Sequence, residues 1–414
     1  MTERSRGQVI QAPLFALMLL AALDIVQESP QAVLWTAPAI LLSAMLIAWA
    51  AESAQFFIAQ GFALAILAWL QTLPEFAVEA VLAWHQQVPL LLANLTGALR
   101  LLTGLGWPMI YATAAYFHKR KYGKPLNEIV LEPEHCVEVV GLAAPLLYMT
   151  FVYFKASLTV WDGLALTLIY VAYLAVLSKM PPQEEEGIED LERIPRAIVT
   201  ARPAVRTASI IGLFVVGGLL IYYTAEPFLG SLLSVSAVLG VPSFVFVQWV
   251  APFVSEFPEK VSAFYWARTV SRASMALMNM VSSNINQWTL LTAMLPVVYS
   301  FSRGSVSAIP FDAQQELELL MTLGQSLIGM LFLVNMKLSW WEAAVLFALW
   351  FVQFALSPVP QGPGVLGFLA THIHWYVTIA YLGWSAIELI RVLLGLRSAD
   401  AFIHFSKVWR TRVR

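Results

Sequence analysis

Long apolar stretches separated by short polar segments dominate the pattern of this chain. About twelve of them reach the roughly 20 residues that a helix needs to cross the hydrocarbon core of a bilayer. In chain order they lie near residues 11–27, 32–50, 61–86, 89–117, 137–154, 158–178, 208–225, 242–266, 273–301, 316–334, 339–357 and 366–395. The pattern predicts an all-α polytopic membrane protein with about twelve transmembrane helices.

Basic residues gather in a few of the polar segments between these stretches. Clusters of Lys and Arg follow the fourth, sixth, eighth and last predicted helices, at 119–124, 179–206, 268–272 and 397–414. All of them fall on one side of the membrane, and a positive excess marks the cytoplasmic side. We therefore expect an integral multi-pass protein of the plasma (inner) membrane with both termini cytoplasmic.

The amino-acid composition narrows the class of protein further. The chain is 59% hydrophobic and 12% charged, against about 25% charged residues in a typical soluble domain. The net charge of −2 and the lack of a basic stripe give no indication of nucleic-acid binding. The single cysteine, Cys136, excludes an intramolecular disulfide and offers no thiolate metal cluster. Because no Gly-x-x-x-x-Gly-Lys-Ser/Thr motif is present, ATP-driven pumping is not expected.

Two Pro-Glu pairs interrupt the apolar pattern. Leu73-Pro74-Glu75 lies inside one apolar run and Phe257-Pro258-Glu259 inside another, with the two glutamates 184 residues apart (259 − 75). An ionisable group at bilayer depth costs about 2.5–3.5 kcal/mol on insertion scales, so it indicates a functional site. The proline beside it breaks the helix and frees backbone carbonyls. Matching breaks in two halves are typical of transporters built from inverted repeats.

Other segments recur at nearly the same offset. Asn94 matches Asn279, 185 residues later (279 − 94), in the helix after each Pro-Glu pair. The segment from Leu158 to Gly163 matches that from Leu338 to Ala343, at an offset of 180 (338 − 158). Matches in the same order and at similar offsets indicate an internal repeat.

The repeat sets the predicted organisation of the chain. Each copy spans five predicted helices, and an odd number places the second copy upside down relative to the first. The predicted units are an extra N-terminal transmembrane helix (1–31), the first five-helix repeat (32–178), a cytoplasmic charged linker (179–207), the second five-helix repeat (208–357), and an extra C-terminal transmembrane helix with a basic tail (358–414).

These motifs resemble those of the cation/Ca2+ exchanger superfamily, which includes the sodium/calcium exchangers. Each repeat of that family carries a Gly-Thr-Ser-x-Pro-Glu helix and then a helix with Gly-Ser-Asn-x-x-Asn or Asp. The second repeat keeps Ser255, Pro258 and Glu259, and residues 282–287 keep much of the second motif. The first repeat keeps Thr72, Pro74 and Glu75 and then departs from the pattern. The resemblance spans roughly residues 33–357 and implies a ten-helix exchanger core.

The resemblance also implies a cation site. Glu75 and Glu259 would be the central ligands of Na+ or Ca2+, hard cations that take oxygen ligands. Thr72 and Ser255 precede these glutamates by three and four residues, which places them on the same helical faces. The remaining candidate ligands are Glu256, Ser283, Asn284 and Gln287.

The implied function is secondary active cation antiport, with alternating access around the midplane glutamates. The protein would be a transporter rather than an enzyme, with no cofactor besides the transported Na+, Ca2+ or H+, and its partners would be inorganic cations and membrane lipids. Carboxylates packed together cannot all ionise at low cost, so cation/H+ exchange competes closely with Na+/Ca2+ exchange. The sequence does not give the oligomeric state.

Arg100 is an unexpected cation inside an apolar run. We hypothesise that it takes the place of a bound cation by pairing with Glu256 or Glu259. Two alternatives stay open, namely a different partner such as Glu79 and a side chain that extends to the membrane interface. An Arg-Glu salt bridge that locked the site would make the protein a non-transporting scaffold or regulatory subunit on the exchanger fold.

Further charged groups allow two interpretations each. Glu52, Glu79 and Glu226 are either gate carboxylates or interfacial charges at helix ends. The acidic segment 181–206 is either a solvated linker or a regulatory ion site. The tail at 402–410 mixes aromatic and basic residues, which is typical of an interfacial helix, although a frayed terminus fits as well.

Overall fold

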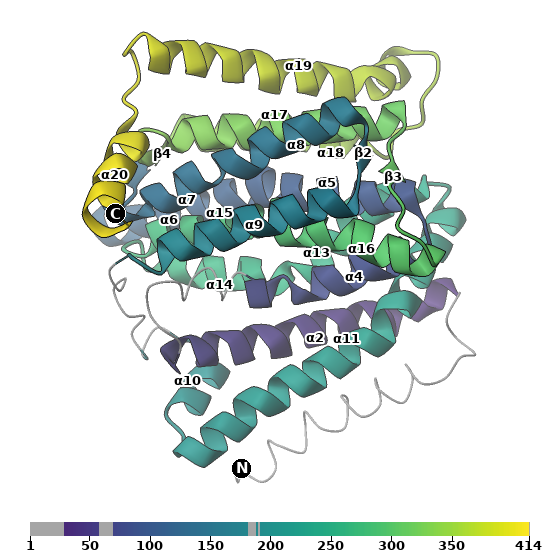
Figure 1. Ribbon diagram of the computed structural model, residues 1–414, viewed down its shortest axis with the longest axis horizontal. Coiled ribbons are helices and arrows are strands. Elements are labelled where there is room, and N and C mark those ends of the chain that lie inside the picture. Colours follow the sequence, from purple (N-terminus) through teal and green to yellow (C-terminus); the bar gives the residue numbers. More distant parts are fainter. Residues whose placement is uncertain (1–28, 58–68, 181–187, 189–190, 414) are drawn as a thin grey trace.

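The computed structural model describes residues 29–57, 69–180, 188 and 191–413. The predicted first span, the start of the predicted span 61–86 and the acidic residues Glu184, Glu185 and Glu186 lie outside the described residues. The described chain is built from helices that run roughly side by side, with two small sheets at their ends (Figure 1).

The first half begins with the 3-10 turn η2 (Pro30–Ala32) and contains the following helices: α2 (Val33–Ala54), α4 (Leu73–Trp84), α5 (Val88–Leu101), α6 (Trp107–Tyr122), α7 (Cys136–Gly141), α8 (Ala143–Lys155) and α9 (Val160–Leu177). Two more 3-10 turns are η3 (Gln55–Phe57) and η6 (Pro133–His135), and the π-helical turn η5 (Leu102–Gly106) joins α5 to α6. The short helix α10 (Arg193–Val199) leads to the second half.

The second half contains α11 (Pro203–Leu239), α12 (Ser243–Val245), α13 (Ala251–Ser255), α14 (Phe257–Arg268), α15 (Ala273–Asn286), α16 (Thr292–Arg303), α17 (Ala313–Leu333) and α18 (Trp340–Leu356). The π-helical turns η8 (Phe246–Val250) and η9 (Gln287–Leu291) continue α12 into α13 and α15 into α16. The C-terminal region contains α19 (Val365–Leu393), α20 (Asp400–Val408) and the π-helical turn η10 (Trp409–Val413).

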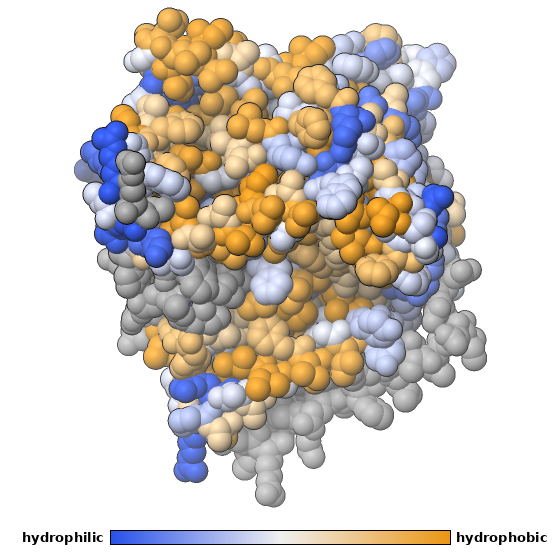
Figure 2. All heavy atoms as spheres, viewed as in Figure 1, coloured by the Kyte–Doolittle hydropathy of each residue, from blue (hydrophilic) through white to orange (hydrophobic). Residues whose placement is uncertain are grey.

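Seven helical stretches of the described chain are long and apolar enough to cross a membrane: Pro30–Phe57, Val88–Tyr122, Pro133–Lys155, Val160–Leu177, Pro203–Leu239, Ala313–Leu333 and Val365–Leu393. Two shorter apolar helical stretches, Ser243–Ser255 and Trp340–Leu356, lie among them. Figure 2 shows a largely apolar middle with hydrophilic residues gathered towards the ends of the helices. The prediction of an all-α polytopic membrane protein is confirmed.

Each Pro-Glu pair starts a new helix instead of continuing an old one. Glu256 ends α13 with φ −92° and ψ 1°, and Pro258 is at the second position of α14. Thr72 has similar angles, φ −85° and ψ −4°, ahead of Pro74 in α4. Proline fits the first turn of a helix because its missing N–H has no intrahelical acceptor there. The predicted span 242–266 is therefore a broken crossing rather than one helix.

The two sheets show how the halves are related. Strand β1 (Glu128–Val130) pairs with β4 (Lys337–Ser339), and β2 (Ser157–Leu158) pairs with β3 (Ile309–Pro310), both antiparallel. The repeat offset relates β1 to β3 (309 − 128 = 181) and β2 to β4 (337 − 157 = 180). A two-fold rotation that exchanges the halves therefore converts one sheet into the other. The sheets lie at opposite ends of the helices (Figure 1), so the halves are inverted.

The π-helical turns follow the same symmetry. Leu102 begins η5 and Gln287 begins η9, at an offset of 185 (287 − 102). Each turn directly follows the helix that packs beside a Pro-Glu helix, α5 beside α4 and α15 beside α14. π-helical turns are rare and occur mostly at functional sites, so both halves carry the same irregularity near the Pro-Glu pairs.

Two helix pairs flank the helices that carry the Pro-Glu motifs. Helices α2 and α11 pack together on one side, and α17 packs against α19 on the opposite side (Figure 1). Helix α19 is the predicted extra C-terminal helix. The tail beyond it is helical as α20, which packs against α7.

Candidate cation site

Three buried carboxylates from the two halves converge at the helix breaks. Glu75 and Glu259 lie in the first turns of α4 and α14, with 0% and 1% of their surface exposed. Glu256 occupies the break before α14 and is 2% exposed. The positive end of a helix dipole favours a negative side chain at its first turn, which helps to hold these acidic groups away from water.

The polar side chains that join these carboxylates come from α15 and η9. The Nε2 atom of Gln287 donates to Glu75 Oε2 at 2.7 Å and to Glu256 Oε1 at 2.8 Å. Ser283 donates its hydroxyl to Glu259 Oε1. Gln287 therefore links the acidic group of the first half to that of the second half.

Three oxygen atoms of this cluster have no hydrogen-bond donor among the described residues. They are Glu75 Oε1, Glu259 Oε2 and Gln287 Oε1, and all are buried. Buried polar atoms are normally satisfied, so these oxygens are free to meet another group. Carboxylate and amide oxygens are the ligands that Na+ and Ca2+ take. The donor set therefore fits a hard cation as transported substrate.

Among the described residues, Lys260 brings a cation to this cluster. Its Nζ lies 2.5 Å from Glu256 Oε2, and the two side chains are 5% and 1% exposed. Sequence reasoning missed this residue, although it directly follows Glu259. The signal was its place inside an apolar run and four residues after Glu256, the spacing that brings two side chains together on a helix.

Arg100 does not pair with Glu256 or Glu259, and it does not replace a cation at this site. Its guanidinium lies 2.5 Å from Glu318 Oε2 on α17 and also bonds to Thr96. The alternative partner Glu79 is not used either, and a side chain with no exposed surface does not extend to the interface. The reason is geometric: Arg100 lies on the face of α5 that packs against α17.

The other predicted ligands bond elsewhere. Ser255 donates to the carbonyl oxygens of Ala251 and Pro252, one turn back in its own helix. Asn284 donates to Thr103 Oγ1 at 2.8 Å, and therefore reaches η5 instead of a glutamate.

Thr72 joins the site indirectly. Its Oγ1 accepts a hydrogen bond of 2.5 Å from Asn286, the residue before Gln287. The structure thus places Glu75, Glu256, Glu259, Ser283 and Gln287 together, with Thr72 next to them.

The three remaining carboxylates fall into two groups. Glu79 accepts a hydrogen bond of 2.9 Å from Asn94, Glu52 accepts one from Ser262, and both glutamates are buried. Glu226 is exposed, lies 2.9 Å from His85, and lines a cavity of about 220 Å3 between α4 and α11. Only Glu226 therefore matches the description of an interfacial charge.

The geometry defines a transporter of the ion-exchanger class: two inverted repeats with acidic helix breaks that meet inside the bundle. A family model described as sodium/calcium exchanger protein matches residues 31–179 and 209–357, which together make up more than half of the chain. The protein belongs to this family, and like its members it is a transporter and not an enzyme.

Solved structures agree with this assignment. The crystal structure of the H+/Ca2+ exchanger CAX matches with a TM-score of 0.86 and 29% identity, over 99% of this chain and 98% of that chain. The sodium-calcium exchanger NCX_Mj matches with a TM-score of 0.51 and 17% identity, over 77% of this chain and 95% of that chain. YfkE matches with a TM-score of 0.53 and 13% identity, over 84% and 91%. These last two likenesses concern the fold alone. No curated protein matches the chain by sequence.

Proposed function

We propose that the protein is a secondary antiporter that exchanges Ca2+ for H+ at Glu75, Glu256 and Glu259. The observation that carries this proposal is the set of unpartnered buried oxygens contributed by both halves, on Glu75, Glu259 and Gln287. The likeness to the H+/Ca2+ exchanger CAX along nearly the full length of both chains supports Ca2+ and H+ over Na+.

The charge of the cluster supports the same pair of ions. Three carboxylates at −1 each and the Lys260 ammonium at +1 give a net charge of −2. Either one Ca2+ or two protons would neutralise this charge. Closely packed acidic groups in a low-dielectric site cannot all remain ionised without a counter-ion, so protons would replace Ca2+ when it leaves. Exchange would then carry two protons for each Ca2+.

Alternating access would come from the helix pair α2 and α11. These helices are joined by a hydrogen bond of 2.9 Å between Thr36 and Ser231, and by one of 2.7 Å from Ser43 to the Gly217 carbonyl. They would therefore move as a unit across the broken helices, and so expose the carboxylates to one side of the membrane at a time. In this proposal the termini face the cytoplasm and the protein resides in the plasma (inner) membrane.

Lys260 supports a second candidate function. An ammonium held 2.5 Å from Glu256 inside the site resembles a permanent counter-ion. If the Lys260 ammonium keeps every other cation out of the cluster, the protein would be a non-transporting scaffold or regulatory subunit on the exchanger fold. The ion pair that prevents transport would then involve Lys260 and not Arg100.

Flux measurements separate the two candidates. Wild-type protein, Glu75→Gln, Glu259→Gln and the control Glu128→Gln would be reconstituted in liposomes. Glu128 is a partly exposed residue that pairs with Lys337 on the surface. A proton gradient should drive Ca2+ movement in wild type and in the control, and the two site variants should fall to the level of empty liposomes. Folded wild-type protein that moves no Ca2+ under any H+ or Na+ gradient would refute the antiporter and favour the scaffold.

A further inference from the structure

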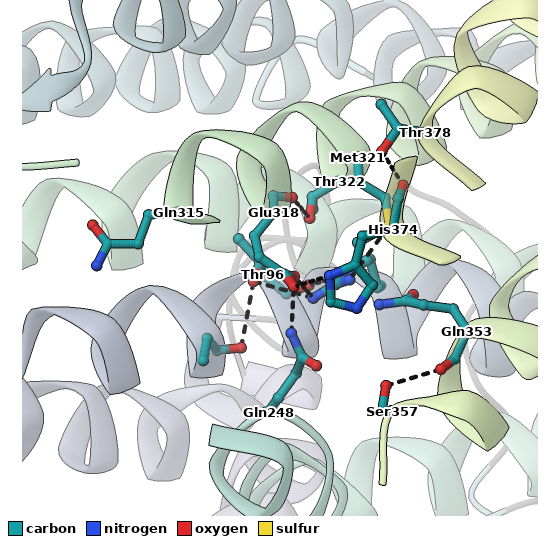
Figure 3. A network of polar contacts seen from close by, with 12 residues as sticks. Thr96, Gln248, Gln315, Glu318, Met321, Thr322, Gln353, Ser357, His374 and Thr378 are labelled. Atoms are coloured by element: carbon teal, nitrogen blue, oxygen red, sulfur yellow. Dashed lines mark hydrogen bonds and ion pairs between the residues drawn. The ribbon is translucent and has the colours of Figure 1, made fainter. Parts of the chain in front are cut away.

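A second buried charge cluster lies outside the carboxylate site. Glu318 on α17 is 4% exposed, and its two oxygens meet groups from three other elements. Oε2 accepts hydrogen bonds from Arg100 of α5 at 2.5 Å and from Gln248 of η8 at 2.9 Å. Oε1 lies 3.0 Å from Nδ1 of His374 on α19. Figure 3 shows Gln248 and His374 pointing toward the Glu318 carboxylate.

His374 belongs to the extra helix and not to the repeats. Helix α19 lies beyond residues 31–179 and 209–357, the two stretches that match the exchanger family. It packs along α17, and His374 reaches from it to Glu318. An imidazole is the side chain that gains or loses a proton near neutral pH. The added helix therefore contributes a titratable group to the core.

Glu318 lies in the wall of a cavity that begins at the helix ends. The cavity has a volume of about 310 Å3, and its lining includes Pro89, Pro242, Asp312 and Gln315 besides Glu318. Pro89 opens α5, Pro242 precedes α12 and Asp312 caps α17, so the cavity starts at one end of the bundle. Its size exceeds the room that a single water molecule needs, so water from the bundle end can enter the space that Glu318 helps to line.

The charges of the groups that face the cluster can be summed. Among the described residues, the other titratable or charged side chains that face the cluster are Arg100, Tyr381 near Arg100, and Asp312 at the cavity wall. The uncharged Gln248 comes from η8. The charges of Glu318 and Arg100 sum to zero. The net charge of the cluster is therefore +1 with a proton added to the His374 imidazole and 0 without it.

Buried polar atoms around the cluster lack partners. In Figure 3 the amide of Gln353 on α18 points toward His374, and neither of its polar atoms has a hydrogen-bond partner among the described residues. The same holds for the hydroxyl of Tyr381. Unsatisfied buried groups next to a charged cluster are where ordered water is expected.

We propose that His374 and Glu318 form a proton-binding site, separate from the cation site, that sets how tightly α19 is held to the transport core. The imidazole takes up one proton, and the resulting imidazolium forms an ion pair with Glu318 Oε1 through Nδ1. When the proton leaves, Glu318 keeps Arg100 and Gln248 but loses its charged link to α19. Gln248 lies in the same broken crossing as Glu256, so the site is connected to the helix that carries a carboxylate of the cation site.

Nuclear magnetic resonance of histidine tests this site without relying on transport. The full-length protein, with its six histidines labelled at the ring carbon Cε1, would be titrated from pH 5 to pH 9 in nanodiscs. The His374→Gln variant identifies the resonance, because that signal disappears. His372→Gln is the matched control: His372 lies on the same helix and is partly exposed, with its ring bonded to the Phe368 carbonyl.

The expected result is a titrating His374 signal that depends on Glu318. In Glu318→Gln, His374 should bind its proton about tenfold more weakly, because the carboxylate that stabilises the imidazolium is gone. If Glu318→Gln does not fold, Glu318→Asp gives the same comparison, because its shorter side chain withdraws from His374 while keeping a charge for Arg100. A His374 signal that does not titrate, or that titrates identically in the Glu318 variant, would overturn the proposal.

A second measurement tests the link to α19. The melting temperature of wild type should differ between pH 6 and pH 8 by a step that His374→Gln removes and His372→Gln keeps. A step that survives in His374→Gln would show that α19 is not held by this proton.

Discussion

Gln287 donates a hydrogen bond of 2.7 Å to Glu75, and so joins the π-helical turn of the second half to the acidic helix of the first half. The residue replaces the Asn or Asp that the resemblance leads one to expect at this position. Its longer side chain also reaches Glu256. One amide thus holds two acidic groups in place while its own oxygen stays free for a cation.

The first prediction concerns this amide. Gln287→Met keeps the volume of the side chain but removes both donors and the free oxygen. Since a hydrogen bond to a charged group is worth about 1.5–3 kcal/mol, the KM for Ca2+ should rise at least about tenfold. Initial Ca2+ uptake rates over a range of Ca2+ concentrations measure this change.

The control for this variant is Gln86→Met. Gln86 is exposed and bonds to Ser302 at the surface, so its loss should leave KM unchanged. Equal values of KM in Gln287→Met and wild type would remove Gln287 from the cation site.

The second prediction concerns the buried pair Lys260 and Glu256. Removing one partner of a buried ion pair costs about 3–5 kcal/mol, because the other charge remains unpaired. Lys260→Met should therefore destabilise the protein strongly, and combining it with Glu256→Gln should recover much of that loss. Denaturant unfolding of the wild type, the single variants and the double variant gives the coupling energy. Additive effects of the two changes would mean that the pair does not form in solution.

The third prediction concerns Gly97, where α5 meets the broken crossing. A Cβ atom on Gly97 would lie 2.0 Å from the backbone oxygen of Gln248, so Gly97→Ala must push η8 away from α5. Overpacking of this kind costs about 1–3 kcal/mol, and exchange should slow because η8 leads to Glu256. Thermal unfolding and Ca2+ flux measure the two effects.

The matched control is Gly212→Ala, because no neighbouring atom lies within 4 Å of the added Cβ. Alanine is the better helix former by about 0.5–1 kcal/mol, so this variant should be as stable as wild type or more so. A Gly97→Ala protein as stable as Gly212→Ala would contradict the close contact between α5 and η8.

Much of the fold follows from the sequence because its signals are local. Proline beside glutamate in an apolar run marks a helix break at bilayer depth, and the 184-residue spacing of Glu75 and Glu259 reveals the repeat. The inverted relation then follows from the odd number of helices, and the pairing of β1 with β4 and of β2 with β3 agrees with it.

The partners of the buried charges could not be predicted, because they depend on how helices pack. Arg100 forms an ion pair with Glu318, which is 218 residues away in sequence. From the sequence alone, Glu318 resembles a charge at a helix end. Lys260 was missed because it directly follows Glu259, which already marked this position as charged. The π-helical turns, which begin at Leu102 and Gln287, carry no sequence pattern of their own.

In the proposed mechanism, Ca2+ and protons exchange at one set of carboxylates. The most direct measurement records both ions at once, in liposomes with a Ca2+ indicator and a pH indicator inside and the membrane potential clamped by K+ and valinomycin. Each Ca2+ entering should be matched by about two protons leaving, a ratio that follows from the neutralisation of like charges, and Glu75→Gln should abolish both fluxes together. Ca2+ entry without proton release, or entry that requires a Na+ gradient, would contradict it.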